Sequence, residues 1–333
     1  TTRNQSSHVK VYSMVTPYFI TRPYCPVCRS KKYDTLYSCS FLESPIKNYL
    51  DAVFPPVGYY EPEYLVNAQF TLIECLECGL IFQKEIPNDF LSNKLYEEWI
   101  DAQKTYESHE RKDDLALFAQ YAQEVMMLIA YFGAIPSQLK FFDFGMGWAK
   151  WSRMAKAFGC DSCGTEVSKI RIENATSQGL KVISWNDIPG HTFDFINANQ
   201  VFEHLTEPLE TLIYLKRALK PDGLIKICVP DGKGIKRALT VGDWTAPLGT
   251  KNSLNAVSPL EHINCFTYAS LRRLAEEAGL EIVTIPIRVQ YRSSTNWQPI
   301  KPLFKNVLRP IYRNLLQKTT YLFFRQKKSQ ATY

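Results

Sequence analysis

The chain has 333 residues, of which 45% are hydrophobic and 22% charged, which is the composition of a globular protein and excludes a wholly disordered chain. Nine cysteines are too few for a small disulfide scaffold. The net charge of +6 indicates an anionic partner only weakly, because an average does not say where the charge lies.

The first 25 residues contain no uninterrupted apolar run followed by a small-residue cleavage site, and such a run is what a secretory leader requires. No stretch of about 18 apolar residues follows, so a membrane-spanning helix is not predicted. We therefore expect a cytoplasmic protein whose cysteines stay reduced and act as metal ligands or as buried packing.

Two pairs of cysteines stand out near the beginning of the chain, and the expected zinc ligands are Cys25, Cys28, Cys75 and Cys78. Each CxxC turn brings two thiolates to one side of a loop, and two turns complete a closed tetrahedral Zn(II) site. Such a site has a structural role, because it has no open position for water. The alternative is two unrelated pairs of buried cysteines. The residues between the pairs are expected to form an insertion with a turn at residues 54–58.

From residue 139 the pattern alternates between short apolar runs and helical runs, which predicts a parallel sheet with crossover helices. Strands are expected at 139–144, 162–167, 181–185, 193–198, 224–229 and 281–287, with helices at 149–158, 170–178, 208–219 and 268–278. The preceding stretch, 88–132, is predicted to be helical. There Tyr96, Trp99 and Tyr106 are either a lid over the acceptor or the ordinary packing of a connector.

Polar residues and glycines follow the predicted strands. The first strand ends in Asp143, with Gly145 and Gly147 behind it, and glycines allow the tight turn and close ligand approach typical of doubly wound sheets. Three further sets follow the next strands: Glu166, then Asn186 with Asp187, then Asn199 with Gln200. Because ligands bind at the carboxyl ends of such strands, these residues are expected to lie at one site.

Residues 139–287 resemble a class I S-adenosylmethionine-dependent methyltransferase. The resemblance rests on the Asp143-x-Gly145-x-Gly147 turn, Glu166, the 201–205 sequence Val-Phe-Glu-His-Leu and the 219–223 sequence Leu-Lys-Pro-Asp-Gly. It implies that Asp143, Gly145 and Gly147 hold the methionine part of the cofactor and that Glu166 binds the ribose. It also implies that Asn186 and Asp187 lie by the adenine, and Asn199 and Gln200 by the sulfonium.

Methyl transfer to a hydroxyl or a carbon acid requires a base, and histidine suits that role near neutral pH. His204 follows the fourth predicted strand, and His262 lies beside Glu261 in the loop before the last helix. We expect His262, Glu261 and His204 to be the catalytic residues, with Glu261 orienting or polarising a neighbouring base. For either histidine the alternative is a structural hydrogen bond that holds its loop.

Paired cysteines ahead of this fold, together with Glu261-His262, resemble sugar C-methyltransferases that act on nucleotide-linked deoxysugars. The resemblance implies a saccharide acceptor. Pro259 and Leu260 stand before Glu261 where that group has a tyrosine, so oxygen and carbon both remain candidate targets.

The last 52 residues contain ten basic residues and no acidic one. Apolar residues recur there at helical spacing between Leu303 and Leu316, with Lys305, Arg309 and Arg313 on the other side. A basic amphipathic helix of this kind, followed by Tyr321–Phe324, predicts peripheral membrane contact through 302–328. The alternative is a final helix packed on the protein's own core.

These features predict an α/β protein, a doubly wound, mostly parallel Rossmann-like methyltransferase sheet with additions at both ends. The expected units are a zinc-binding module (1–90), a helical connector or lid (91–136), a cofactor-binding domain (137–290) and a basic amphipathic tail (291–333). The expected activity is S-adenosylmethionine-dependent methylation of a small, saccharide-type acceptor, which a lipid anchor would present at a membrane. The rivals are a nucleic-acid methyltransferase, disfavoured by the scattered basic residues, and a cofactor-binding regulatory protein without catalysis.

Overall fold

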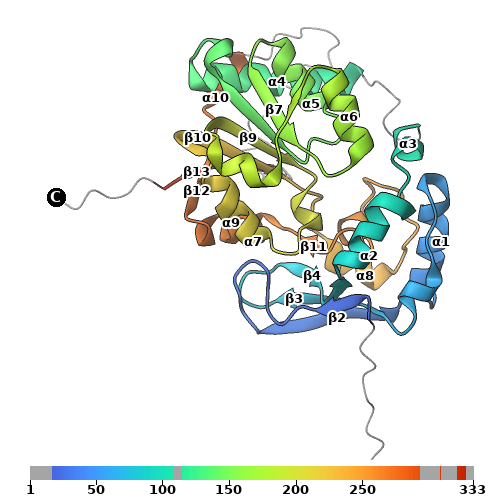
Figure 1. Cartoon of the computed structure of the whole chain (residues 1–333). Helices are drawn as coiled ribbons and strands as arrows, with labels where there is room; N and C mark the ends of the chain where they lie inside the picture. Colours follow the sequence, from blue (N-terminus) through green and yellow to red (C-terminus); the bar gives the residue numbers. More distant parts are fainter. Residues whose placement is uncertain (1–16, 108–114, 293–307, 309–320, 328–333) are drawn as a thin grey trace, which may run out of the picture.

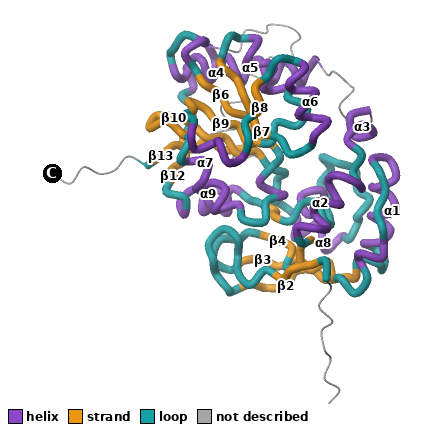
Figure 2. The backbone as a smooth tube through the Cα atoms, viewed as in Figure 1, coloured by secondary structure: helices purple, strands orange, loops and turns teal. Residues whose placement is uncertain are grey.

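The structure is a computed structural model that describes residues 17–107, 115–292, 308 and 321–327. A central sheet with helices around it forms the larger part, and a small sheet of strands β2, β3 and β4 lies at one side of it (Figure 1). The same arrangement, coloured by secondary structure, is seen in Figure 2.

The central sheet has seven strands in the order β12-β13-β10-β9-β6-β7-β8. Five of them, from β10 to β8, run parallel, and β13 lies antiparallel between β10 and β12. Their bounds are β6 (Lys140–Phe144), β7 (Asp161–Thr165), β8 (Lys181–Val182), β9 (Phe193–Asn199), β10 (Leu219–Cys228), β12 (Leu280–Val283) and β13 (Tyr321–Gln326). The predicted Rossmann-like, mostly parallel sheet is confirmed.

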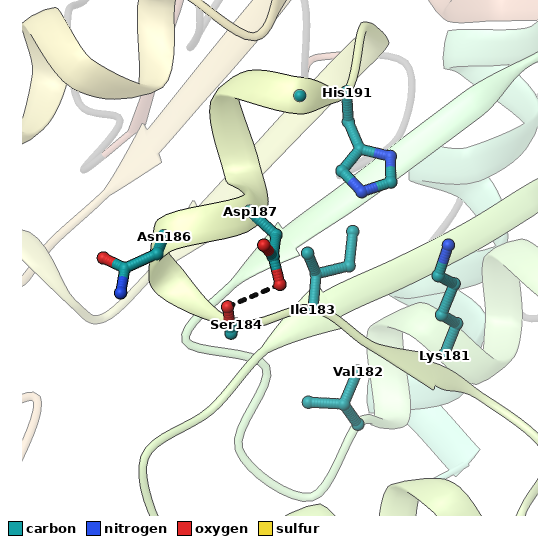
Figure 3. Close-up of a pocket in the computed structure, with 8 residues that line it drawn as sticks. Lys181, Val182, Ile183, Ser184, Asn186, Asp187 and His191 are labelled. Atoms are coloured by element: carbon teal, nitrogen blue, oxygen red, sulfur yellow. Dashed lines mark hydrogen bonds between the residues drawn. The ribbon is translucent and has the colours of Figure 1, made fainter.

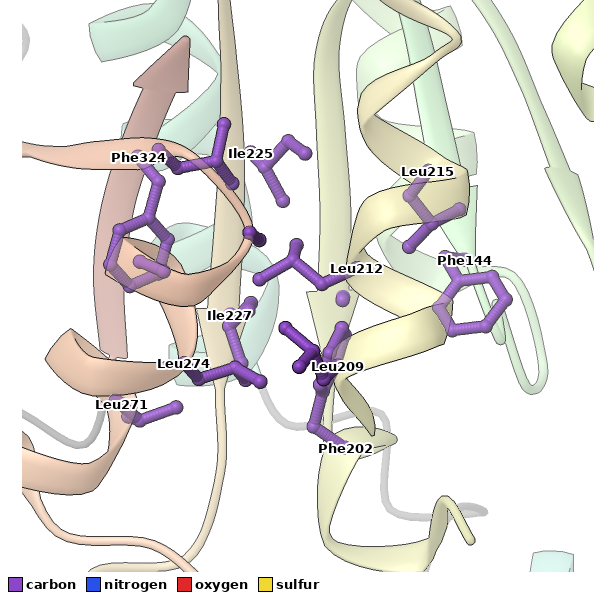
Figure 4. Packing of buried hydrophobic residues seen from close by; sticks show 14 of the residues in the cluster. Phe144, Phe202, Leu209, Leu212, Leu215, Ile225, Ile227, Leu271, Leu274 and Phe324 are labelled. Carbon is purple, nitrogen blue, oxygen red and sulfur yellow. The ribbon is translucent and has the colours of Figure 1, made fainter. Parts of the chain in front are cut away.

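Successive residues of a strand point to opposite faces of the sheet, so the central sheet packs against an apolar layer on each face. Phe141 packs with α4 (Leu115–Phe132), α5 (Lys150–Ala157) and α10 (Ile287–Arg292), whereas Phe142 packs on the face of α7 (Pro208–Lys216) and α9 (Tyr268–Glu277). Figure 4 shows Leu212 and Leu274 of these last two helices meeting Ile227 of β10. A further helix, α6 (Lys169–Ser177), packs through Ala175 on the glycine turn after β6.

Helix α4 is long and apolar enough to cross a membrane by length and composition alone. Its Glu124, however, forms a buried ion pair with Lys226 of β10, with 2.5 Å between the charged atoms. Val125 and Leu128 of the same helix are fully buried against the central sheet. These contacts pack one face of α4 against the central sheet.

The cysteine-rich part is built around a four-stranded sheet in the order β11-β4-β3-β2. Its first strand, β11 (Asn264–Cys265), comes from the loop that follows β10, whereas β2 (Tyr33–Ser40), β3 (Gln69–Cys75) and β4 (Ile81–Gln83) come from the N-terminal region. A separate pair joins β1 (Phe19–Thr21) to β5 (Glu85–Pro87). One continuous apolar cluster includes both the cysteines and the sheet face under α7.

The remaining elements lie in the connections between the strands and helices given above. They are α1 (Ile46–Val57), η1 (Pro62–Leu65), α2 (Asp89–Lys94), the π-helix η2 (Leu95–Trp99), α3 (Ala102–Thr105), η4 (Pro136–Gln138), η5 (Trp185–Gly190), η6 (Phe202–His204), α8 (Ile235–Val241) and η7 (Asn255–Val257).

Three expectations about local structure are wrong. The predicted membrane-facing segment Tyr321–Phe324 is strand β13, whose Phe324 is fully buried in the sheet. Residues 54–57, predicted as a turn, form the last turn of helix α1. Pro55 and Pro56 lie in this turn, and the helix ends directly after them. The last predicted strand ends at Val283, and 287–292 form helix α10. Apart from residue 308, the predicted amphipathic segment 302–320 lies outside the described residues.

Candidate active site and cysteine cluster

The four predicted zinc ligands meet at one point. The sulfurs of Cys25 and Cys78 are 3.6 Å apart, those of Cys28 and Cys75 are 3.4 Å apart, and all four lie within 4.8 Å of one another. No pair of them is joined as a disulfide. Four thiolates at these separations match the donor set of a closed tetrahedral zinc site.

The two CxxC turns have the same backbone geometry. The residue after each pair has a positive φ, 60° at Arg29 and 70° at Gly79. The amide of that residue donates to the carbonyl of the first cysteine, at 2.9 Å in both turns. Gly79 adopts this left-handed conformation without the cost of a Cβ, and Arg29 adopts it with a side chain.

The glycine turn after β6 lies at the carboxyl edge of the sheet. Gly145 has φ 69°, and a Cβ there would lie 2.7 Å from a methyl carbon of Val201, so only glycine fits this approach. Ala149, where the usual motif has a third glycine, has φ 58° and precedes α5. The turn thus keeps its left-handed backbone although one glycine has been replaced.

Asp143 lies beneath this turn and is 3% exposed. Its two oxygens accept hydrogen bonds from Ser152 of α5 and Asn197 of β9, both at 2.7 Å. Burial raises the pKa of the Asp143 carboxyl to about 6, against the opposing effect of these two bonds. The carboxylate therefore joins β6, β9 and α5, which fixes the turn where the cofactor is expected.

Glu166 follows β7 and connects two loops at the same edge. One of its oxygens accepts from the amide of Gly147 at 2.8 Å, and the other accepts from the amides of Val167 and Ser168 at 2.9 and 3.1 Å. Its side chain thus ties the loop after β7 to the glycine turn. Its expected contact with a ribose stays a prediction.

Asn186 and Asp187 lie in η5, beyond β8, and line an open pocket of about 440 Å³ with Lys181 and His191 (Figure 3). Asp187 accepts a hydrogen bond from the Ser184 hydroxyl at 2.7 Å. These residues therefore lie at the edge of the sheet where an adenine contact is predicted.

Asn199 is the last residue of β9, and Gln200 follows it with a φ of 57°. The amide of Gln200 donates to the carbonyl of Cys228 at the end of β10, at 2.8 Å. The structure therefore holds this pair at the carboxyl end of β9, tied to the end of β10. Its expected place near the sulfonium stays a prediction.

The two candidate catalytic histidines, His204 and His262, come together with their ring centres 4.9 Å apart. The Nδ1 of His204 lies 2.9 Å from the carbonyl oxygen of Glu261 and 3.0 Å from the Tyr96 hydroxyl. The Nδ1 of His262 faces the carbonyl oxygen of Asn255. Since a carbonyl oxygen only accepts, each Nδ1 carries the proton, and each Nε2 keeps its lone pair.

The cluster formed by Tyr96, His204 and His262 is partly shielded from water, but one side of it remains accessible. Burial holds the pKa of both imidazoles well below the usual range, and the neighbouring His262 adds to this effect at His204, so both rings are neutral at pH 7. Burial also raises the pKa of the Glu261 carboxyl to about 7. Tyr96 remains 38% exposed and the His204 side chain 25% exposed, so a small molecule can approach from that side.

Glu203 was part of a sequence motif, but its own role was missed. It is 1% exposed, burial raises the pKa of its carboxyl to about 8, and neither oxygen has a hydrogen-bond partner among the described residues. Its Oε1 lies 3.9 Å from Nε2 of His204. The sequence signal was present, because a carboxylate directly follows the buried apolar residue Phe202.

The cysteine-rich part holds the His262 loop in place. Gln83 of β4 is fully buried, and its side-chain amide donates to the carbonyls of Ser258 and His262, both at 3.1 Å. Arg22 donates to Asn264 at 2.7 Å, and Asn264 donates to the carbonyls of Phe202 and Leu205 on the His204 side. These contacts join segments far apart in the chain, and no local sequence pattern predicts them.

The three aromatic residues of the connector have different surroundings. Trp99 is fully buried in the apolar cluster of the cysteine-rich part. Tyr96 contacts His204, and Tyr106 packs on Trp148 of the glycine turn with 4.6 Å between ring centres. A lid role is therefore compatible with Tyr96 and Tyr106, whereas Trp99 is core packing.

Residues 116–285, just over half of the chain, match the sequence family described as a methyltransferase domain. The chain belongs to this family. It is an S-adenosylmethionine-dependent methyltransferase of class I, as the glycine turn, the sheet order and the family match together require. A search of curated proteins finds no match.

Among solved structures, the methyltransferase resembles the plantazolicin methyltransferase BpumL in complex with a pentazolic desmethylPZN analogue and SAH. The two chains are 15% identical, the match covers 71% of this chain and 95% of that chain, and the TM-score is 0.48. A putative sarcosine dimethylglycine methyltransferase from Galdieria sulphuraria is 19% identical, with 66% and 88% covered and a TM-score of 0.39. PKMT2 from Rickettsia typhi in complex with AdoHcy is 14% identical, with 62% and 52% covered and a TM-score of 0.38.

Proposed function

We propose that this methyltransferase transfers a methyl group from S-adenosylmethionine to an oxygen or carbon of a small, saccharide-type acceptor. One observation carries the proposal: Tyr96, His204 and His262, from three distant segments, meet beyond the carboxyl end of β9. That place follows Asn199 and Gln200, where the reactive methyl of the cofactor is expected.

The cofactor would lie along the edge already described. Gly145 and Gly147 would let its methionine part approach the backbone, with Asp143 fixing the turn, and Glu166 would accept from the ribose. Asn186 and Asp187 would contact the adenine. Each of these residues lies at or next to the carboxyl end of β6, β7, β8 or β9, which is where doubly wound sheets bind ligands.

The chemical step needs alignment of the acceptor and removal of one proton. When bound, S-adenosylmethionine would supply the methyl group, its carbon–sulfur bond breaking as the acceptor atom bonds to the methyl carbon and leaving a thioether. Nε2 of His262 or His204, free because Nδ1 faces a carbonyl, takes the acceptor's proton. Glu261 supports the pair through its backbone carbonyl, which fixes the His204 ring.

The four cysteines are proposed to bind one structural Zn(II). Their 3.4 and 3.6 Å sulfur separations and the repeated backbone turn support this assignment. Because β4 joins the cysteines to the His262 loop through Gln83, zinc would stabilise the acceptor side of the site rather than take part in catalysis.

A saccharide acceptor is supported by the polar, partly exposed cluster and by the aromatic Tyr96 at its rim, because aromatic faces pack well on sugar rings. A nucleic-acid acceptor is less well supported, since Arg325 of the basic C-terminal stretch pairs with Glu281 within the sheet. Membrane contact through 302–320, a lipid-linked acceptor and a cytoplasmic location stay predictions.

The test uses cell extracts incubated with methyl-labelled cofactor and analysed by mass spectrometry for an acceptor-dependent product. We expect His262→Gln to lower turnover by about 100-fold or more, the usual contribution of a general base. S-adenosylhomocysteine affinity, measured by calorimetry, should stay within error of the parent protein. Unchanged turnover would remove His262 from the mechanism, and cofactor binding without any methylated product would favour the regulatory alternative.

A further inference from the structure

Glu203, His204 and His262 form a second cluster of potential metal ligands, distinct from the cysteines. One ligand atom from each lies within 4.8 Å of the other two. The residues come from η6 and from the loop before β11, so the fold brings together two elements nearly sixty positions apart in sequence. Two imidazoles and one carboxylate are a donor set that many open metal sites use.

Both histidines are oriented as metal ligands usually are. In each ring Nδ1 faces a backbone carbonyl, of Glu261 for His204 and of Asn255 for His262. This contact fixes the ring and leaves Nε2 as the electron-pair donor, which is the arrangement that supports metal-bound histidines in proteins.

The burial of the Glu203 carboxylate is a second, independent observation that points to a bound cation. It is 1% exposed, and neither carboxylate oxygen has a hydrogen-bond partner among the described residues. Burying an unpartnered carboxylate is costly unless a cation or a donor compensates it. Its Oε1 lies 3.9 Å from Nε2 of His204, so a cation between these atoms would supply the missing partner.

We propose that Glu203, His204 and His262 bind a divalent transition-metal ion in an open site that takes an oxygen of the acceptor. Imidazole donors favour Zn²⁺, Co²⁺, Ni²⁺ or Fe²⁺ over Mg²⁺ and Ca²⁺. Bonds of about 2.0–2.2 Å would draw the ligand atoms to about 3.3 Å apart, from present separations of up to 4.8 Å. Three protein ligands leave at least one position for the acceptor.

The inference rests on the proposed function for the location of the acceptor, and it changes the role of the two histidines. As ligands they donate the same Nε2 lone pairs that a base would use. The metal ion then lowers the pKa of the hydroxyl that it binds, and the hydroxyl proton is released to solvent. Such a site serves an oxygen acceptor rather than a carbon acceptor, because oxygen is the better ligand.

The test is titration with Co²⁺ of the full-length protein loaded with only one equivalent of zinc per chain, followed by its visible absorption. Zinc held by four thiolates would occupy the cysteine site, so added cobalt reports on the remaining site. We expect one Co²⁺ per chain, with a ligand-field spectrum that lacks a thiolate charge-transfer band. Glu203→Gln and His262→Gln should each weaken cobalt binding by about 100-fold.

His191→Gln is the matched control, because His191 lies in the pocket beside η5 and belongs to neither cluster. It should bind cobalt as the parent protein does. Circular dichroism checks that all three variants are folded, and S-adenosylhomocysteine binding checks it again for Glu203→Gln and His262→Gln. No cobalt binding by the zinc-loaded parent, or equal binding by folded Glu203→Gln and His262→Gln, would overturn the proposal.

The two proposals fail in different ways. Cobalt binding that requires Glu203 and His262 would support the metal site even if no methylated product is found, and the missing product would then count against the proposed function. Methyl transfer by a protein that binds no cobalt would leave the proposed function standing and overturn the metal site.

Discussion

The proposed cofactor side and the proposed acceptor side of this enzyme are assembled differently. The cofactor side uses short segments that follow β6, β7 and β9, each tied to its neighbours, as Glu166 is to Gly147. The acceptor side uses Tyr96, His204 and His262, which distant segments contribute and which β4 of the cysteine-rich part holds. The first is a property of one domain, whereas the second depends on the contact between two parts of the chain.

The change expected to disturb the proposed acceptor side most is loss of the zinc proposed for the cysteine-rich part. We expect Cys75→Ser to reduce the zinc content from one ion per chain to none. The variant should also be less stable, because a structural zinc site contributes on the order of 10 kcal/mol to folding. The His262 loop would lose its support and turnover would be lost. Metal analysis and thermal unfolding measure these effects.

Cys39→Ser is the matched control, since Cys39 lies between the two pairs but outside the quartet. It should keep its zinc and its unfolding temperature. A wild-type protein that is folded and free of metal would contradict the zinc assignment altogether.

The next largest effect is expected in the central sheet. Phe324→Ala should lower the free energy of unfolding by about 3–5 kcal/mol, because it leaves a cavity where a fully buried ring packs on the sheet face covered by α7 and α9. Arg325→Ala, on the same strand, removes a partly exposed ion pair with Glu281 and should cost less than about 1 kcal/mol. Chemical denaturation compares the two, and equal losses would contradict the position of β13 in the sheet.

The contrast between the two sides also explains what sequence reasoning could predict. The β6–β9 strands, the glycine turn and Glu166 were predictable, because periodicity and turn chemistry act over a few residues. The cysteine quartet was predictable because paired spacing carries its own geometry. Strand β13 was not, since its apolar run follows a basic stretch and its partners β10 and β12 are far away in sequence. The contacts of Gln83 and Arg22 were not predictable for the same reason.

Glu166→Ala tests the cofactor side alone. It removes the carboxylate that accepts from the amides of Gly147, Val167 and Ser168 and, by the proposal, from the ribose. Since a hydrogen bond to a charged group contributes about 1.5–3 kcal/mol, S-adenosylhomocysteine affinity should fall by roughly 10- to 100-fold. Calorimetry measures it, with Glu173→Ala on the exposed side of α6 as the control. An unchanged affinity would refute the ribose assignment.

Gln83→Met tests the contact between the two parts with the smallest change. Methionine keeps the length and volume of the side chain, but the carbonyls of Ser258 and His262 lose the amide that donates to both. We expect unfolding to become easier by about 1–3 kcal/mol, the cost of buried groups left unpaired. Turnover should fall by several-fold while zinc content and S-adenosylhomocysteine affinity are kept. Gln69→Met, at an exposed position of β3, is the control. If Gln83→Met instead weakens cofactor binding and turnover equally, the cysteine-rich part supports the whole sheet edge, and the division between the two sides is wrong.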